Sequence, residues 1–421
     1  MLTMRTYVVT SPSLAAAVQR AHSTLDFDPL VVEIIPRVCR TSAQTKKILE
    51  DAKAKEEGRV PMQQLNHFSN FLENIEDNID VDLFRFITRP LMAASMHAFY
   101  GPRNPFAVHP ELVEKYWDWD HMNLELGAGV LPQLTTRKAY QGLEAIVKGF
   151  IEYTNNGYHK EANPLMQEKK RMHNSEGISD DENARLELAI SFAINSNAGI
   201  TCFWVLNNLF SRPHLLGQIR NEIYQNAFEA PGTISVNKLR DTCPLLNSVF
   251  RESVRLITPM VSARYITEDT ILEDSYLLRK GSLVQIANGV IHADTNIWGD
   301  DASRFNPHRF LYSPRGSKSN HDGSISNEKA NIVHAAAFRG FGGGTNMCPG
   351  RHFAQMEVLG ATAALALGFD IQPISGKSQL RWDPPRNENK FSLALLKPSR
   401  AVNVRFSRRA EFKMVKWVLK A

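Results

Sequence analysis

One cysteine stands in a glycine-rich segment, FRGFGGGTNMCPGR, which runs from Phe338 to Arg351. Three consecutive glycines precede Cys348, and Pro349-Gly350 follow it. Glycine runs occur where the backbone must approach another group closely or take a positive φ. A proline followed by an apolar periodic run is typical of a helix start, so we expect the sulfur to lie just outside a helix N-terminus. Amide N–H groups at such a position stabilise a thiolate.

Three kinds of chemistry use a thiolate. A nucleophile needs a nearby base such as histidine, and sequence alone does not supply that geometry. A zinc site needs three further ligands, and no pair of cysteines here has CxxC spacing. An axial haem ligand needs no other protein ligand, because the porphyrin fills the in-plane positions. The loop meets the needs of haem best, and we expect the other three cysteines, Cys39, Cys202 and Cys243, to be buried small apolar residues.

The loop resembles the haem-binding segment of the cytochrome P450 family, whose pattern is FGxGxxxCxG. The resemblance implies haem b with a cysteine thiolate as the axial iron ligand, which favours O–O cleavage. Asn346 stands two residues before the cysteine, where most members have an arginine that binds a haem propionate. The positions that match the pattern are Phe341, Gly342, Gly344, Cys348 and Gly350.

Further family motifs follow in the expected order. FRESVRL places Glu252 and Arg255 at ExxR spacing, which taken alone is an ordinary helix-surface ion pair worth about 0.3–0.5 kcal/mol. FNPHRF supplies Arg309, which resembles the arginine that joins that pair in a buried triad. Arg264 in SARYITED stands where the family has an arginine for a haem propionate, and bidentate guanidinium–carboxylate geometry suits this role.

The segment Glu182–Leu209 predicts one long apolar helix that ends at an Arg-Pro pair. In the family this helix carries a small residue and an acid–threonine pair, kinks beside the iron and delivers protons. Counting back from the Arg-Pro pair places Ala193 at the small residue, Ser196 at the acid and Asn197 at the threonine. Asparagine does not titrate, so any proton relay must use water or Ser196. The same letters also fit polar positions on an ordinary helix face.

An asparagine in the threonine position, followed by Phe203-Trp204, resembles the branch of prostacyclin synthase and the sterol 7-alpha-hydroxylases. The preferred hypothesis is a monooxygenase that takes electrons from an NADPH-dependent cytochrome P450 reductase. It inserts one oxygen atom from O2 into a small apolar substrate. The alternatives are an isomerase or dehydratase that rearranges a peroxide without O2, and a degenerate haem binder. The last arises because no tryptophan precedes Trp117, so the family's early Trp-x-x-x-Arg propionate clamp is not found.

Two groups of residues flank these motifs. Met260 and Val261, after Thr258-Pro259, stand where the family often contacts substrate, although core packing explains them equally well. Arg339, Arg351 and His352 flank the cysteine and predict either a basic docking face for an acidic reductase or a solvated face. The FGGG–CPGRHFA wording resembles fungal members, many of which act in secondary metabolism.

Bulk composition sets the remaining bounds. The chain has 421 residues, 43% hydrophobic, with a net charge of +5 and no aromatic-interleaved basic stripe, so no nucleic-acid partner is expected. The sequence contains no run of about 18 apolar residues, so it does not predict a membrane span. The family's anchor helix and proline-rich hinge are not found. We expect either that early sequence is missing or that this is a shortened member, with endoplasmic-reticulum and cytoplasmic locations both open.

The elements that must position these residues predict a mainly α protein with a small β lobe, as a single domain over residues 1–421, and the resemblance implies that this is the cytochrome P450 fold. Helix and strand patterns are assigned as follows: a strand, a turn and a helix over Arg5–Ala21; helices over Leu83–Gly157 broken at Pro90, Pro102, Pro105 and Pro132; a helix that starts at Pro213; a helix over Leu245–Leu256; short strands over Ser262–Ile291; an exposed loop over Ser313–Asn331; and short strands in the last 50 or so residues.

Overall fold

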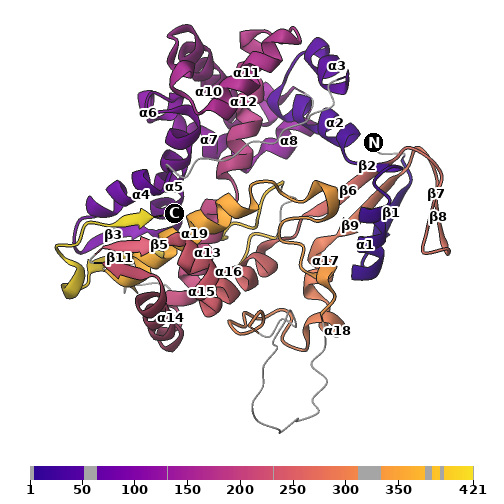
Figure 1. Ribbon diagram of the computed structural model, residues 1–421. Helices are drawn as coiled ribbons and strands as arrows, with labels where there is room; N and C mark the ends of the chain where they lie inside the picture. The colour runs from indigo at the N-terminus through magenta and orange to yellow at the C-terminus, as the bar shows by residue number, and fades with distance from the viewer. Residues whose placement is uncertain are drawn as a thin grey trace. The chain divides into compact units, whose positions relative to one another are not determined.

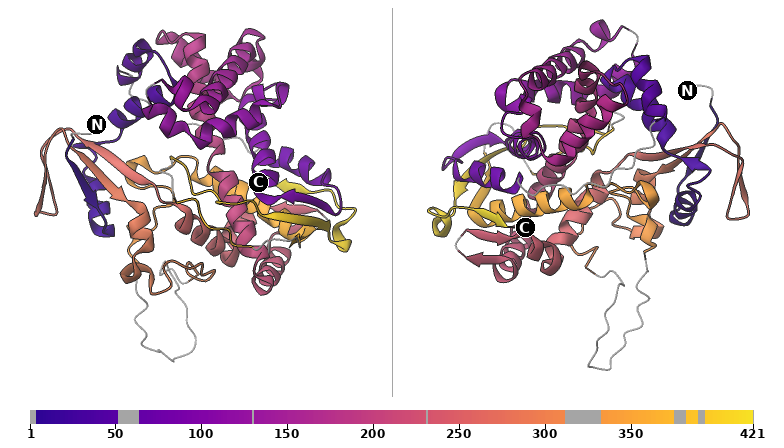
Figure 2. Two further views of the ribbon diagram at one scale, coloured as in Figure 1. Left: turned by 180° about the vertical axis from the view of Figure 1, so that it is seen from behind. Right: turned by 45° about the horizontal axis from the view of Figure 1, so that its top comes forward.

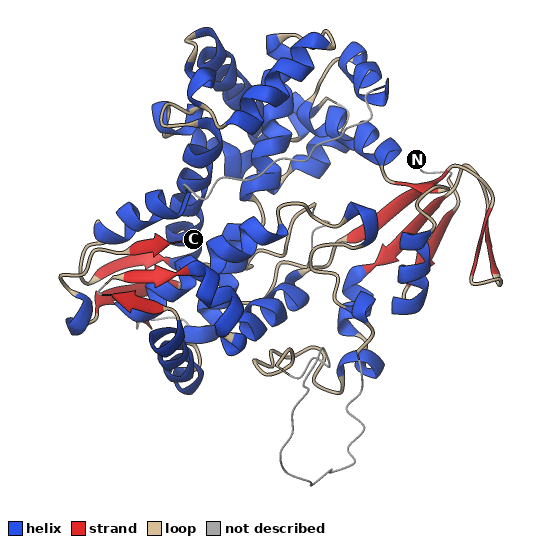
Figure 3. Cartoon of the chain, viewed as in Figure 1, coloured by secondary structure: helices blue, strands red, loops and turns tan. Residues whose placement is uncertain are grey.

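The computed structural model describes residues 4–51, 64–129, 131–230, 232–311, 333–374, 382–388 and 393–420. They form two compact units, described separately below. The first comprises Met1–Asp26 with Pro244–Cys348, and the second Phe27–Cys243 with Pro349–Ala421. Helices dominate and the strands form small sheets, as Figures 1 and 3 show, which confirms the mainly α prediction. The single-domain organisation stays a prediction.

The first unit is built on a four-stranded sheet of order β1-β9-β6-β2, with β1 parallel to β9 and the other pairs antiparallel. A separate hairpin pairs β7 with β8. The strand prediction over Ser262–Ile291 is confirmed as far as Ala287, after which a short helix begins. The elements of this unit are β1 (Thr6–Val9), α1 (Pro12–Arg20), β2 (Leu25–Asp26), α16 (Pro244–Ile257), β6 (Val261–Ile266), β7 (Thr270–Leu272), β8 (Tyr276–Leu278), β9 (Leu283–Ala287), α17 (Asn288–Ala293), α18 (Thr295–Trp298), η2 (Ala335–Ala337) and η3 (Gly344–Asn346).

Local sequence explains how this unit begins. Ser11 caps α1 by accepting a hydrogen bond from the Leu14 N–H at 3.2 Å, and Pro12 occupies the first helical turn, where no intrahelical N–H is needed. The predicted strand, turn and helix are therefore confirmed. The predicted helix over Leu245–Leu256 is also confirmed, as α16, which buries an apolar face at helical spacing that includes Leu246, Val249 and Phe250.

The second unit consists mostly of helices. Helix α10 packs against α7 and α12, and these purple and magenta helices lie side by side in Figures 1 and 2. The helices are α2 (Asp28–Cys39), α3 (Ala43–Asp51), α4 (Gln64–Glu73), α5 (Leu83–Tyr100), α6 (Pro105–Val108), α7 (Leu112–His121), α8 (Asn123–Ala128), α9 (Pro132–Thr135), α10 (Arg137–Asn155), η1 (Tyr158–Glu161), α11 (Pro164–Ser175), α12 (Asp180–Asn195), α13 (Ala198–Phe210), α14 (Pro213–Asn226), α15 (Val236–Thr242), α19 (Arg351–Gly368) and η4 (Ala410–Phe412).

Two short sheets complete the second unit, in the orders β10-β11-β3 and β12-β5-β4. The predicted return to strands near the end of the chain is confirmed by β10, β11 and β12. The predicted loop over Ser313–Asn331 lies outside the described residues. The strands are β3 (Ile79–Asp82), β4 (Phe228–Ala230), β5 (Thr233–Ser235), β10 (Phe369–Pro373), β11 (Asn403–Arg408) and β12 (Val418–Lys420).

Two prolines behave differently in this unit. Pro213 starts α14, as predicted. The predicted break at Pro90 is wrong, because Pro90 lies inside α5 with helix on both sides. Most of α5 is buried and packs against α4 and α13. We infer that this packing outweighs the cost of a helix-interior proline, which is about 3 kcal/mol.

The long helix predicted over Glu182–Leu209 is present as two helices rather than one. Helix α12 ends at Asn195 and α13 begins at Ala198, with Ser196 and Asn197 in a turn between them. Asn197 departs from helical geometry, with φ −120° and ψ −47°. The break therefore falls at the two residues assigned to the acid and threonine positions.

Candidate active site

The glycine-rich loop of the first unit turns sharply. Gly342 and Gly344 have φ of +73° and +65°, a region that side chains with a Cβ rarely adopt. A Cβ on Gly344 would also lie 2.9 Å from the Gln19 Cβ of α1. The Cys348 N–H donates to the Phe341 carbonyl at 2.9 Å, so the loop folds back on itself. The glycines are therefore required by the backbone path of the loop.

The four cysteines divide into two classes. Cys39, Cys202 and Cys243 are buried, as predicted, and burial raises the pKa of each of their thiols to about 12. Cys348 is exposed, and so is Asn346, whose Oδ1 accepts from the Thr345 hydroxyl at 3.4 Å. Of the four thiols, Cys348 is the accessible one, as a ligand or nucleophile must be.

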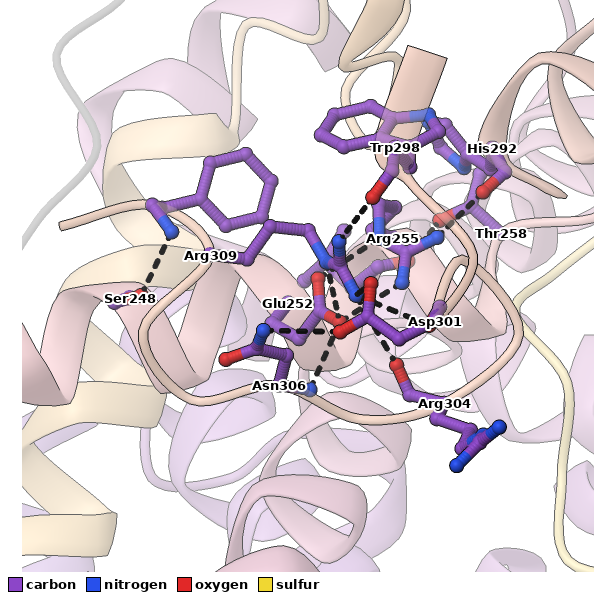
Figure 4. A network of polar contacts seen from close by, with 12 residues as sticks. Ser248, Glu252, Arg255, Thr258, His292, Trp298, Asp301, Arg304, Asn306 and Arg309 are labelled. Carbon is purple, nitrogen blue, oxygen red and sulfur yellow. Dashed lines mark hydrogen bonds and ion pairs between the residues drawn. The ribbon is translucent and has the colours of Figure 1, made fainter. Parts of the chain in front are cut away.

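A buried ion-pair network stands in the same unit. Arg255 donates to both Glu252 carboxylate oxygens at 2.8 Å, and the Arg309 Nε donates to Oε1 of the same carboxylate at 3.0 Å. Figure 4 shows both guanidiniums directed at Glu252. The side chains of Glu252 and Arg255 are 0% exposed and that of Arg309 is 8% exposed. This is a desolvated triad, not the exposed helix pair that the ExxR spacing alone suggests.

The triad is tied to the segment that follows α18. The Asn306 N–H donates to Glu252 at 3.1 Å, and Arg309 donates to the Trp298 carbonyl at 2.5 Å. Arg309 also pairs with Asp301 at 2.9 Å. Burial would raise the pKa of Asp301, but the hydrogen bonds from Asn306 and Arg309 outweigh it and lower that pKa. The Glu252 carboxylate thus joins α16 to Asn306 and Arg309, more than 50 positions later in the chain.

Two further arginines of this unit are buried. Arg264, predicted as a propionate clamp, is 4% exposed; burial lowers its pKa and Asp26 partly opposes this. Arg339 is 1% exposed, so its predicted place on a docking face is wrong. It donates to Asn288 Oδ1 at 2.6 Å, and burial together with the charge of Arg264 lowers its pKa to about 10. By contrast, Arg351 is half-buried and His352 is exposed.

In the second unit, the helix break carries two polar side chains with different partners. Asn197 is half-buried, and its Oδ1 accepts from the Leu395 N–H at 3.3 Å. Ser196 is fully buried and donates to Asp120 Oδ1 at 2.7 Å. Ala193, one turn before Ser196, is exposed. Ser196 therefore faces the protein interior, whereas Ala193 does not.

Sequence reasoning missed Asp120. Asp120 follows Trp117 and Trp119, and no motif or family resemblance points to its carboxylate. The helical pattern of EKYWDWDH places Tyr116 and Asp120 four residues apart, on one face of α7. Two polar groups on the buried face of an amphipathic helix were the available clue.

The residues predicted to contact substrate form a short run after α16. Thr258 is buried, and its hydroxyl donates to the Val254 carbonyl at 2.6 Å. Met260 and Val261 are half-buried, and Val261 pairs with Ala287 at the start of β6.

Comparison with known proteins decides the family. The Cytochrome P450 family model matches residues 149–403, more than half of the chain. A cytochrome P450 monooxygenase of Hypoxylon pulicicidum is 30% identical over 98% of this chain and 83% of its own length. One of Gibberella zeae is 27% identical over 99% of this chain and 83% of its length. The chain belongs to the cytochrome P450 family.

The relatives also bear on the reaction. A cholesterol 7-alpha-monooxygenase of Cricetulus griseus is 22% identical over 70% of this chain and 58% of its own length. All three relatives carry monooxygenase names. This P450 is an oxidoreductase of the haem-thiolate monooxygenase class, and the peroxide isomerase alternative is not favoured. Members of the family bind haem iron through a cysteine thiolate and use a redox partner.

The residues of the first unit fit haem. Cys348 offers an exposed sulfur on a loop whose glycines allow close approach, and axial ligation needs no second protein ligand. Arg264 and Arg339 are buried guanidiniums whose charges repel each other, a setting in which an anionic propionate is favourable. Thiolate-ligated haem supplies the activation of dioxygen.

One helical segment of this P450, Asp180–Phe210, is long and apolar enough to cross a membrane by length and composition. Of its most apolar stretch, 67% is buried inside the protein, as in a core helix. It is also the segment that breaks at Ser196 and Asn197. We read it as the central core helix of the fold.

Proposed function

We propose that this P450 monooxygenase binds haem b through the Cys348 thiolate and inserts one oxygen atom from O2 into a small apolar substrate. The observation that carries the proposal is the exposure of Cys348 on the glycine-rich loop, while the other three thiols are buried. Residues 1–421 act together as one P450 domain in this proposal. The experiment below tests it directly.

The haem-binding residues have distinct roles. Phe341, Gly342, Gly344 and Gly350 shape the loop around the sulfur. Arg264 binds a propionate, and its burial strengthens that contact because the local dielectric is low. Asn346 replaces a charged clamp with a neutral, exposed side chain, which offers a propionate a weaker hydrogen bond than an arginine does.

Substrate contact is proposed for three residues, each assigned from its position in the sequence: Ala193 in the second unit, and Met260 and Val261 in the first. Each is at least partly exposed and small or apolar, which suits an apolar organic molecule. Asn197 orients water by hydrogen bonding without titrating, so Ser196 is the hydroxyl available for proton transfer.

The electron donor is an NADPH-dependent cytochrome P450 reductase. The half-buried Arg351 and the exposed His352 belong to the proposed docking face for an acidic partner, whereas the buried Arg339 does not. A role in secondary metabolism follows from the resemblance of the FGGG–CPGRHFA segment to fungal members of the family. The next experiment on this P450 is the chemical identification of its substrate.

The reduced, CO-bound absorption spectrum tests the cofactor assignment. We expect the purified chain to show the Soret band of thiolate-ligated haem and Cys348→Ala to lose it. Cys39→Ala is the matched control, because that thiol is fully buried and should leave the band in place. A parent chain that takes up no haem, or a Cys348→Ala variant that keeps the band, contradicts the proposal.

Product analysis tests the reaction. We expect turnover to require NADPH, reductase and O2, with one atom of labelled O2 in the product. Turnover of an endoperoxide or hydroperoxide alone, without these components, would show isomerase chemistry instead.

A further inference from the structure

A continuous series of polar contacts runs through the break in the central helix. Ser196 donates to Asp120 Oδ1 at 2.7 Å, and Asp120 Oδ2 pairs with the Lys397 ammonium. Tyr116 lies 2.5 Å from the Ser196 oxygen. Because the single Ser196 proton points to Asp120, Tyr116 must be the donor in that contact. The series joins α7, the helix break and the segment before residue 400.

The burial of these groups is graded. Tyr116, Ser196 and the Asp120 side chain are 0% exposed, whereas the Lys397 side chain is 19% exposed. Lys397 also lies over the Trp117 ring, 5.4 Å from its centroid. The series therefore begins at a partly exposed lysine side chain and ends at a hydroxyl on the helix break.

A second network in this unit has similar contacts but does not include a hydroxyl at the helix break. On α12, Glu187 pairs with Lys169 at 2.7 Å and accepts from the Tyr100 hydroxyl at 2.7 Å. It has the same three chemical groups, tyrosine, carboxylate and lysine, but its carboxylate, Glu187, lies within α12 and not beside the helix break. This second network supplies a matched structural comparison.

Tyr116 acts as a positioning group. Burial and the charge of Asp120 raise the pKa of Tyr116 well above its ordinary value, although Ser196 opposes this. Tyr116 therefore keeps its proton and holds the Ser196 oxygen in place. The Asp120 carboxylate lies between the Lys397 ammonium and the Ser196 hydroxyl and contacts both.

We propose that Asp120 is the acid of the distal proton relay, displaced from the central helix onto α7, with Ser196 as its outlet and Lys397 as its solvent end. The inference rests on the proposed function, in which the break carries the acid and threonine positions. It makes Asp120 of α7 the acid that serves the central helix, whose own acid position holds Ser196.

The proton balance is simple. The Lys397 ammonium gives a proton to the Asp120 carboxylate, which turns the ion pair into a neutral pair. The Ser196 hydroxyl then turns away from Asp120, and Asp120 passes that proton to the Ser196 oxygen while the Ser196 hydroxyl proton moves to a water molecule at the helix break. Lys397 then recovers a proton from solvent. One proton moves from solvent to the distal water, with no change of oxidation state.

The main test compares the coupling ratio, product formed per NADPH consumed, in Asp120→Asn, Ser196→Ala and the control Glu187→Gln. We expect the first two to lower product formation about 100-fold or more while NADPH oxidation continues, with an increased solvent isotope effect on product formation. The control should keep the parent coupling ratio. Equal losses in Asp120→Asn and Glu187→Gln, or parent-like coupling in Ser196→Ala, would overturn the relay.

A double variant separates chemistry from structure. Asp120→Asn leaves the Lys397 charge without its carboxylate, and this alone can destabilise the fold. Asp120→Asn with Lys397→Gln removes both charges, so we expect it to regain stability without regaining coupling. Recovery of coupling in the double variant would reduce Asp120 to a structural partner and overturn the proposal.

Infrared spectroscopy supplies a readout that does not depend on turnover. The Asp120 carboxylate stretch is identified as the band lost in Asp120→Asn. We expect it to shift in Ser196→Ala and to stay unchanged in Glu187→Gln; an unshifted band in Ser196→Ala contradicts the contact. If the parent chain lacks the thiolate–CO band, the proposed function fails and the relay with it. A parent with that band and unaltered coupling in Asp120→Asn refutes the relay alone.

Discussion

The Arg309 guanidinium lies 3.0 Å from the Glu252 carboxylate, although 57 positions separate the two residues in the chain. Arg255 holds the same carboxylate from the next turn of α16, so one negative charge stands between two buried positive charges. Removing a partner from such a network leaves a buried charge without compensation, which is usually costlier than the gain from forming it.

Glu252→Gln should therefore destabilise the protein strongly. We expect a loss of about 3–5 kcal/mol in the free energy of unfolding, because both guanidiniums would lose their carboxylate in a dry site. Chemical denaturation measures this.

The control is Asp269→Asn in the same unit. Asp269 pairs with Arg279 at 2.7 Å, with side chains 48% and 56% exposed. We expect a far smaller loss than in Glu252→Gln, because solvent screens an exposed ion pair. Similar losses in the two variants would mean that the triad contributes no more than a surface pair.

Glu357 should make stability fall as the pH rises. Burial raises its pKa to about 7 from 4.5, although a hydrogen bond from Ser95 at 2.6 Å opposes this. The folded protein keeps a proton that the unfolded chain loses above pH 4.5, so stability is present below this pH and is lost as the pH approaches 7. Glu357→Gln should be more stable than the parent at pH 8, by up to about 3 kcal/mol, and similar at pH 4.

Unfolding by denaturant at the two pH values checks this. The exposed Glu388 provides the control, since Glu388→Gln should change stability little at either pH. A Glu357→Gln variant with the same gain at pH 4 and pH 8 would point to packing rather than to ionisation.

His292 should make stability fall as the pH falls, the opposite of Glu357. Burial and the charge of Arg255 lower its pKa to about 3 from 6.5, and its Nε2 accepts from the Arg339 N–H at 2.9 Å. Below pH 6.5 His292 binds a proton in the unfolded chain but stays neutral in the folded protein, so stability falls as the pH falls towards 3. The loss approaches about 1.4 kcal/mol for each pH unit below 6.5.

His292→Gln keeps an acceptor at this position without a titrating group. We expect its unfolding free energy to depend less on pH between 6.5 and 5 than that of the parent, whereas the exposed His352→Gln should follow the parent. Parallel pH profiles for the parent and His292→Gln would show that another group controls acid stability.

Much of the fold could be predicted because its evidence is local. Ser11-Pro12 marks the start of α1, and the apolar spacing of α16 marks its buried face. Pro90 misled the prediction because the packing of α5, not its local sequence, decides whether the helix continues.

The sequence by itself determined the cofactor loop and the family, since the glycines and Cys348 act within a few residues of one another. Tertiary structure decided which charges are buried and which residues meet. Arg339 beside the loop proved to be buried, not exposed. Ser196 met Asp120 from 76 positions earlier. Such contacts depend on how distant helices pack, and a side chain's environment is set by that packing and not by its neighbours in the sequence.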